Sequence, residues 1–118
     1  MKAHHKLKVW QRSVDFVAEI YQLTERFPRS EIHGLTSQMR RAAVSIPSNL
    51  AEGAGGRRSG KEFKQFLSIS QGSVAELETQ LIIAERLGYC SGIDELFGEL
   101  DEISKMIIGL QRSLRAPK

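Results

Sequence analysis

The stretch Gln38–Gly53 reads QMRRAAVSIPSNLAEG, and the argument for the fold starts from it. Apolar residues in and just before it recur at spacings of three and four, which places them on one side of a helix: Leu35, Met39, Ala42, Ile46 and Leu50. Pro47 interrupts the pattern, because proline lacks an amide hydrogen and its ring crowds the carbonyl of Ala43. We therefore predict one helix over about residues 32–54, kinked at Pro47.

Three further helices are predicted around this one, over about residues 8–27, 59–87 and 91–114, and no segment has the alternating pattern of a strand. In the first helix the residues expected to face the core are Trp10, Val14, Val17, Ile20, Tyr21 and Phe27. In the third they are Phe63, Phe66, Leu67, Ser70, Val74, Leu77, Leu81 and Ala84, and in the fourth Leu96, Leu100, Ile103, Ile107, Leu110 and Leu114.

The helix ends carry local signals. The segment Ser59–Glu62 fits a capping box, in which the serine hydroxyl and the glutamate satisfy early amides of the third helix. Gly88 stands where a left-handed residue ends that helix. Ser91 is the expected cap of the fourth helix, with Asp94 and Glu95 in its first turn, where carboxylates favour the helix dipole.

Short connections force consecutive helices to lie antiparallel, so the fold class is all-α: an up-down-up-down four-helix bundle, one domain over residues 1–118. If the second and third helices fold back near Arg57, then Ala42 and Ala43 lie opposite Gly72 and Ser73, and Ile46 lies opposite Ser68. Small residues then oppose small residues, which predicts that the two helices approach closely.

Composition excludes several classes of protein. The apolar runs are only a few residues long, far short of the ~20 that cross a bilayer. The basic start, Met1–Lys6, has no apolar signal core behind it, so export is not expected. Cys90 is the only cysteine, which rules out an internal disulfide and a cysteine-based metal site. These features predict a cytoplasmic protein without a membrane span.

The net charge of +3 is unevenly distributed. Residues 1–70 hold twelve Lys/Arg against six Asp/Glu, and residues 71–118 hold five against eight. The basic excess gathers around the turn between the second and third helices: Arg40, Arg41, Arg57, Arg58, Lys61 and Lys64. Such a patch suits a polyanion, although an ordinary solvated surface is the alternative.

No catalytic or metal-binding constellation is evident. His4 and His5 are adjacent and lack a third ligand, and no Glu-x-x-His pair of the di-iron bundles occurs. The glycine-rich stretch 53–61 lacks the Gly-Lys-Ser/Thr ending and the preceding strand of a phosphate loop. Asn49 and Glu52, near Pro47, either bond to backbone groups that the proline leaves unpaired or lie beside Arg41 at a subunit interface.

Eight segments together resemble one family: Leu7–Gln11, Phe27–Pro28, Gly34–Gln38, Arg41–Gly53, Glu62–Phe63, Phe66–Leu67, Gly72–Ser73 and Glu76–Leu81. It is the four-helix bundle family encoded in intervening sequences of large-subunit ribosomal RNA genes, often labelled ribosomal-protein-like. The resemblance implies a ring-like homopentamer with a positively charged face or channel. The same fold occurs in accessory proteins of diversity-generating retroelements, which bind a reverse transcriptase and nucleic acid.

We therefore expect a noncatalytic, cofactor-free oligomeric scaffold that binds RNA or DNA weakly and with little sequence preference. The residues expected to contact nucleic acid are Arg57, Arg58, Lys61, Lys64 and Arg40, while Arg41, Asn49 and Glu52 form a structural polar cluster or an interface. The alternative is a protein–protein adaptor for a nucleic-acid enzyme. Besides the core seams, apolar residues remain for an oligomer contact: Phe16, Ile69, Ile82, Ile83 and Ile108.

Overall fold

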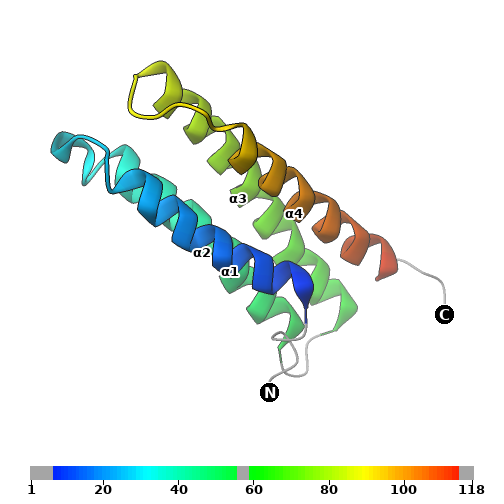
Figure 1. Cartoon of the computed structure of the whole chain (residues 1–118). Coiled ribbons are helices and arrows are strands. Elements are labelled where there is room, and N and C mark those ends of the chain that lie inside the picture. Colours follow the sequence, from blue (N-terminus) through cyan, green and yellow to red (C-terminus); the bar gives the residue numbers. More distant parts are fainter. Residues whose placement is uncertain (1–6, 56–58, 115–118) are drawn as a thin grey trace.

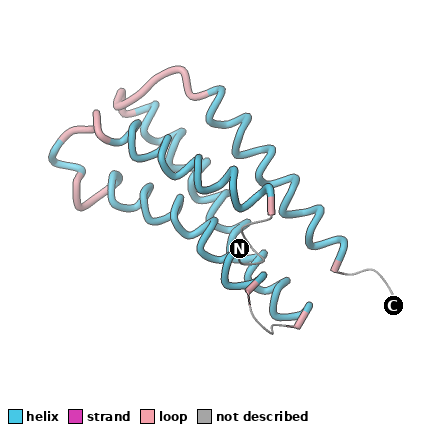
Figure 2. Tube along the Cα trace, turned by 60° about the horizontal axis from the view of Figure 1, so that its bottom comes forward, coloured by secondary structure: helices cyan, strands magenta, loops and turns pink. Residues whose placement is uncertain are grey.

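The structure, a computed structural model, describes residues 7–55 and 59–114. This part of the chain forms four α-helices and one short 3-10 helix and contains no strand, which confirms the predicted all-α class (Figures 1 and 2). The helices are Lys8–Thr24 (α1), Leu35–Ala54 (α2), Gly60–Arg86 (α3) and Asp94–Ser113 (α4), and the 3-10 helix is Arg29–Glu31 (η2).

Consecutive helices run in opposite directions (Figure 1). Each packs against two neighbours, in the order α1, α2, α3, α4 and back to α1, with the largest contact between α2 and α3. The bundle measures 50 × 22 × 21 Å, so its cross-section is nearly square. This topology brings the start of α1, the end of α2, the start of α3 and the end of α4 to one end of the bundle.

A single hydrophobic core runs along the bundle, and each helix buries one side in it. The predicted seams of α2, α3 and α4 are confirmed, because their central residues are almost completely buried: Met39, Ile46, Leu50, Leu67, Leu77, Leu81, Leu100, Ile103 and Ile107. Burial of side chains of this size stabilises the fold by about 1.5–3 kcal/mol each. The core therefore holds the four helices in register.

The core-facing side of α1 differs from the prediction. Val14 and Tyr21 are exposed, whereas Phe16, expected outside the core, is buried. The buried stripe also includes two hydroxyl residues, which the sequence argument passed over as polar. Ser13 donates to the carbonyl of Trp10 at 2.9 Å and Thr24 to that of Ile20 at 2.7 Å. Each hydroxyl is satisfied within its own helix, so its burial leaves no donor without a partner.

Helix α2 continues without a break through Pro47, which is buried. The predicted kink at this residue stays a prediction. Around the proline, side chains of α3 supply polar contacts: Ser70 donates to the carbonyl of Ile46 at 3.0 Å, and Ser73 bonds to the hydroxyl of Ser45 at 2.8 Å. The turn of α2 that contains Pro47 is therefore held against α3 by hydrogen bonds as well as by apolar packing.

Small residues do bring α2 and α3 together, although not in the predicted register. Ile46 meets Ser70 rather than Ser68, so α3 is displaced by about two residues from the expected pairing. Gly72 is exposed, and a Cβ built on it would have no neighbour within 4 Å, so its predicted contact with α2 is wrong. The close approach instead occurs at Gly53, where a Cβ would lie 2.7 Å from a ring carbon of Phe63.

The ends of α3 are as predicted, and the start of α4 is not. Both halves of the capping box at Ser59 and Glu62 are present, and Gly88 has a φ of +78°, the left-handed conformation that glycine adopts without strain. Helix α4 begins at Asp94 after Ile93, with no side-chain cap, so the predicted cap at Ser91 is wrong. Ile93 is buried instead, and its packing fixes the turn.

Candidate nucleic-acid interface

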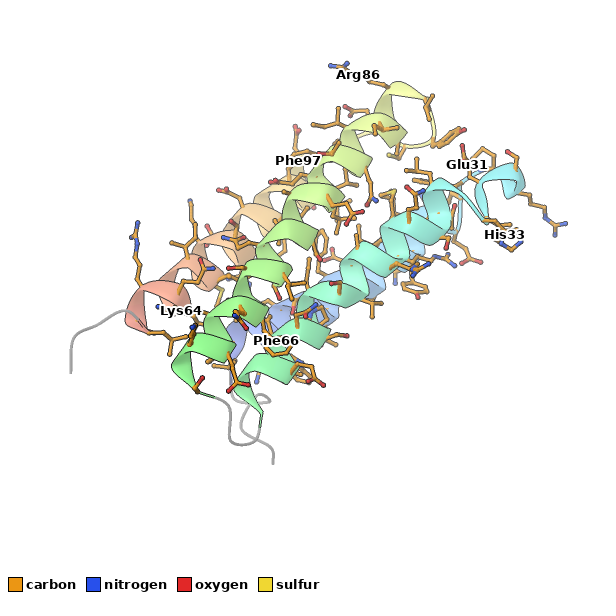
Figure 3. The ribbon with its side chains drawn as sticks, turned by 180° about the vertical axis from the view of Figure 1, so that it is seen from behind. Glu31, His33, Lys64, Phe66, Arg86 and Phe97 are labelled. Carbon is orange, nitrogen blue, oxygen red and sulfur yellow. The ribbon has the colours of Figure 1, made fainter. Side chains whose placement is uncertain are left out.

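One end of the bundle gathers basic side chains from three helices. Lys8 lies at the start of α1, Lys61 and Lys64 lie in the first turns of α3, and Arg112 lies in the last turn of α4. Lys8, Lys61 and Arg112 are exposed and Lys64 is half-buried. We call these four residues the basic end. Figure 3 shows Lys64 at this end and Glu31, His33 and Arg86 at the opposite one.

The structure brings together only part of the predicted site. Lys61 and Lys64 belong to the basic end, whereas Arg57 and Arg58 lie outside the described residues. The sequence argument missed Lys8 and Arg112, because it looked for charge around one turn. The signal that could have found them is the topology itself, since an up-down bundle of four helices places both chain termini beside the middle connection.

The capping box at the start of α3 uses two backbone amides, those of Ser59 and Glu62. The amide of Glu62 donates to the hydroxyl of Ser59 at 3.2 Å, and the amide of Ser59 donates to the Glu62 carboxylate at 3.2 Å. The capping box thus uses early amides and places a negative charge at the helix N-terminus. The cationic side chains at this end include Lys61 in the first turn of α3 and Lys64 one turn later.

Arg40 lies far from the basic end, about 20 Å along the bundle by the helical rise from the end of α2. Its guanidinium joins α2 to α1: Nε donates to the hydroxyl of Thr24 at 2.8 Å, and the group lies 4.5 Å from the ring centroid of Tyr21. A further bond reaches the Glu25 carboxylate at 3.3 Å. The predicted contact of Arg40 with nucleic acid stays a prediction, and within the monomer this side chain holds two helices together.

Arg41, Asn49 and Glu52 lie on or beside the outward side of α2. Asn49 is half-buried and donates to the carbonyl of Ser45 at 2.8 Å and to its hydroxyl at 3.0 Å. This bond is to a neighbouring carbonyl rather than to that of Ala43, which the proline leaves without its helical partner. Arg41 and Glu52 are exposed. The alternative of a subunit interface at Arg41 therefore stays open.

The side of the bundle formed by α1 and α4 is acidic. Arg12 and Glu99 form a two-pronged ion pair there, with distances of 2.6 and 2.9 Å. Burial raises the pKa of the nearby Glu19, and surrounding carboxylates raise it further: Glu99, Asp15 and Glu95. The negative charge of this side contrasts with the positive charge of the basic end.

Reactive groups are scarce in the described part of the chain. Burial, and to a lesser extent the charge of Glu85, raises the pKa of the Cys90 thiol, so the thiol stays protonated at neutral pH. Within residues 7–55 and 59–114 no three His, Cys, Asp or Glu side chains come together as a set of metal ligands. In the same residues no helix combines the length and apolar character that crossing a membrane requires.

No protein with a curated description matches the chain. A family model does match it, over residues 5–109, and that model describes the 23S rRNA-intervening sequence proteins. The match spans nearly the whole chain, including the basic residues at the start of α3 and the complete α2 helix. The chain therefore belongs to the 23S rRNA-intervening sequence protein family.

Proposed function

We propose that this protein is a noncatalytic, cytoplasmic, oligomeric scaffold whose basic end binds RNA or DNA weakly and with little sequence preference. The observation that carries the proposal is the gathering of Lys8, Lys61, Lys64 and Arg112 at one end of a bundle with an acidic α1–α4 side. The family name, which refers to ribosomal RNA, supports a nucleic-acid role. Arg57 and Arg58 precede Lys61 in the sequence and are included in the proposed site.

The chemistry of this end favours phosphate contacts over base recognition. Ammonium and guanidinium groups neutralise phosphates without distinguishing bases. The aromatic rings nearby, Phe63 and Phe66, are half-buried against Gly53, where they support the α2–α3 contact. Each copy offers only a few cationic groups, so binding by one copy is weak. An oligomer repeats the basic end, and the individual contacts then combine through multivalency.

The oligomer, a pentamer by family resemblance, is the second part of the proposal. Exposed large apolar side chains are spread over α1, α2 and α3 rather than confined to the core: Val14, Tyr21, Val44, Ile69, Ile82 and Ile83. Surface of this kind is typical of a contact between proteins. Light scattering at micromolar concentration tests this part, and a monomer mass would overturn it.

The binding experiment measures affinity for short random-sequence RNA and DNA at a series of salt concentrations. We expect the logarithm of the binding constant to fall linearly with the logarithm of the salt concentration. The slope should be about −0.9 for each phosphate contact on duplex DNA. Reversing Arg57 and Arg58 to glutamate, or Lys61 and Lys64 to glutamate, should abolish binding and leave the oligomer intact.

The matched control reverses Arg26 and Arg29, two exposed residues at the opposite end, so that the net charge changes equally. This control should bind almost as the parent does. If the Lys61 and Lys64 variant binds as well as the parent at low salt, the electrostatic proposal is overturned. If both variants weaken binding alike, the net charge rather than the basic end is responsible.

An adaptor for a protein partner is the second candidate, and one observation favours it. Ile32 and Leu87 are 56% and 54% exposed, the highest values among the large apolar residues described, and both lie at the end opposite the basic end. Such residues suit a protein contact rather than a phosphate. Ile32→Ser and Leu87→Ser together would weaken capture of a protein partner while leaving nucleic-acid affinity unchanged.

A further inference from the structure

Two neighbouring sides of the bundle carry exposed apolar residues, and both include α2. On the α1–α2 side, the exposed residues Tyr21 and Val44 line a groove of about 370 Å³ together with Arg41. Val14 is exposed about two turns before Tyr21 on the same side of α1, beyond the lining of that groove. On the α2–α3 side, Ile69 and Ile83 are exposed. We call the first feature the α1–α2 groove. In contrast, α4 has no exposed large apolar residue among those described, and its outward residues are charged: Asp94, Asp101, Lys105 and Arg112.

The apolar residues of α3 on the α2–α3 side form a regular ridge. Ile69, Glu76 and Ile83 are spaced by seven, so they follow one line along the helix. Glu76 lines a second groove, of about 480 Å³, together with Arg41 of α2, which shows that this line faces the α2 side. We call these three residues the α3 ridge. It carries one carboxylate at its middle, with an isoleucine about 10 Å away on either side.

The α3 ridge and the α1–α2 groove match in height along the bundle. Glu76 lies level with Arg41, because both line the same groove and the next turn is fixed by the bond from Ser73 to Ser45. One turn before Ser73, Ile69 lies level with Asn49. The bonds from Arg40 to Thr24 and Tyr21 set the register of α1 against α2. In that register Asn49 lies level with Val14, so Ile69 and Val14 share one height and Glu76 and Arg41 another.

Arg41 and Glu76, the two charged residues that lie level with each other, have no charged partner within the described part of the chain. Across residues 7–55 and 59–114, neither the Arg41 guanidinium nor the Glu76 carboxylate takes part in a hydrogen bond or ion pair, although both line one groove. Arg41 also lines the α1–α2 groove, beside Tyr21 and Val44. A carboxylate that enters this groove from outside therefore meets an arginine.

From these observations we infer that the α3 ridge of one copy packs into the α1–α2 groove of the next, with Glu76 paired to the Arg41 guanidinium of the neighbouring copy and Ile69 packed on its Val14. This contact rests on the oligomer of the proposed function and specifies how that oligomer forms. The contact is heterologous, because the two copies use different surfaces, and heterologous contacts build rings or open filaments.

The position of the two sides decides between these outcomes. Adjacent sides of a square bundle meet at about 90° along the helix that they share. Contacts on two such sides make each copy a wedge in cross-section. A ring closes from four copies when the wedge angle is about 90°, and from five copies when it is about 72°. Opposite sides would instead give a filament. In the ring α2 forms the inner wall, α4 faces outward, and every basic end lies on the same rim.

Charge reversal combined with mixing tests the pairing. Arg41→Glu and Glu76→Arg each place like charges across the contact, so we expect each variant alone to lose most of the assembled mass in sedimentation at low salt. An equimolar mixture should regain mass, because every contact between unlike variants pairs opposite charges. Alternation of the two variants closes a ring of four completely, whereas a ring of five keeps one like-charged contact and regains less. If the mixture gains no mass over either variant alone while the double variant assembles, the two residues act within one chain and the inference is overturned.

A second pair of variants tests the apolar part of the contact. Ile69→Asp should dissociate the oligomer, whereas Ile82→Asp should leave it intact, because Ile82 lies around the helix toward α4. The two isoleucines are 51% and 42% exposed, so neither substitution disturbs the core, and circular dichroism checks that both variants remain helical. If the parent assembles and both variants assemble equally, the inference fails and the oligomer stands. If the parent is a monomer, the oligomeric part of the proposed function fails with it.

Discussion

Substitution of Gly53 probes the closest approach of α2 and α3. In Gly53→Ala the new Cβ would lie 2.7 Å from Cδ1 of Phe63 and 2.9 Å from Cβ of Phe66, both under the contact distance of carbon atoms. The second neighbour is attached to the backbone of α3, so a rotation of the Phe66 side chain cannot relieve the clash. The two helices must separate locally, and overpacking of this kind costs about 1–3 kcal/mol.

Alanine is also the better helix former, which works against this cost by up to about 1 kcal/mol. Gly98→Ala isolates that term, because Gly98 is exposed in α4 and a Cβ there has no neighbour within 4 Å. We therefore expect Gly98→Ala to raise the free energy of unfolding by about 0.5–1 kcal/mol. Gly53→Ala should instead lower it, by up to about 2 kcal/mol once the propensity gain is subtracted from the overpacking cost.

The measurement is urea unfolding followed by circular dichroism, at one protein concentration for all variants, because an oligomer has a concentration-dependent stability. The difference between the two alanine variants is the quantity that matters, since helix propensity contributes to both. If Gly53→Ala gains as much stability as Gly98→Ala, the helices are not in contact at Gly53 and the account of the α2–α3 packing is wrong.

Three further predictions concern single side chains. Arg40→Gln removes the bond to Thr24 and the contact with the Tyr21 ring, so thermal unfolding should show a loss of about 1–2 kcal/mol with little change in nucleic-acid affinity. Glu31 accepts from the Leu35 amide and from the Tyr89 hydroxyl, which lower its pKa. Its contribution should be fully present at neutral pH and lost as pH falls through that lowered pKa, so acid should narrow the stability gap between the parent and Glu31→Gln. Cys90, whose pKa burial raises, should react with a thiol reagent more slowly at pH 8 in the folded protein than in urea.

Much of the fold can be predicted from the sequence, because α2, α3 and α4 each have only one line of apolar residues that could face the core. Helix α1 has two candidate stripes one residue apart, and the more apolar one, with Val14 and Tyr21, lies outside. The buried one contains Ser13 and Thr24, and only a structure shows that their hydroxyls bond back to the helix. Ser91 fails as a cap for a related reason, because burial of Ile93 places the start of α4 two residues later.

The candidate site was less predictable than the fold. Lys61 and Lys64 could be found from local charge, whereas Lys8 and Arg112 become neighbours of that turn only through the topology of the bundle. From the sequence, Arg40 is predicted to contact nucleic acid and Arg41 to join a polar cluster or an interface, although both are arginines on one turn of α2. A difference of about 100° around the helix turns the first toward Thr24 and the second outward. The local sequence does not show which of the two arginines points outward until the buried side of the helix is known.

The surface proposed for nucleic-acid binding and the surfaces proposed for assembly lie in different parts of the bundle. The basic end is an end of the bundle, whereas the α3 ridge and the α1–α2 groove are on its sides, so nucleic acid and neighbouring copies do not compete for one surface. Reversal of Lys61 and Lys64 therefore removes phosphate contacts without touching Glu76 or Arg41. If the copies form the proposed ring, its dissociation should leave every basic end unchanged but remove their repetition, so that affinity falls through lost multivalency alone. A dissociated variant tethered densely on a surface should then recover binding, whereas a Lys61 and Lys64 variant should not.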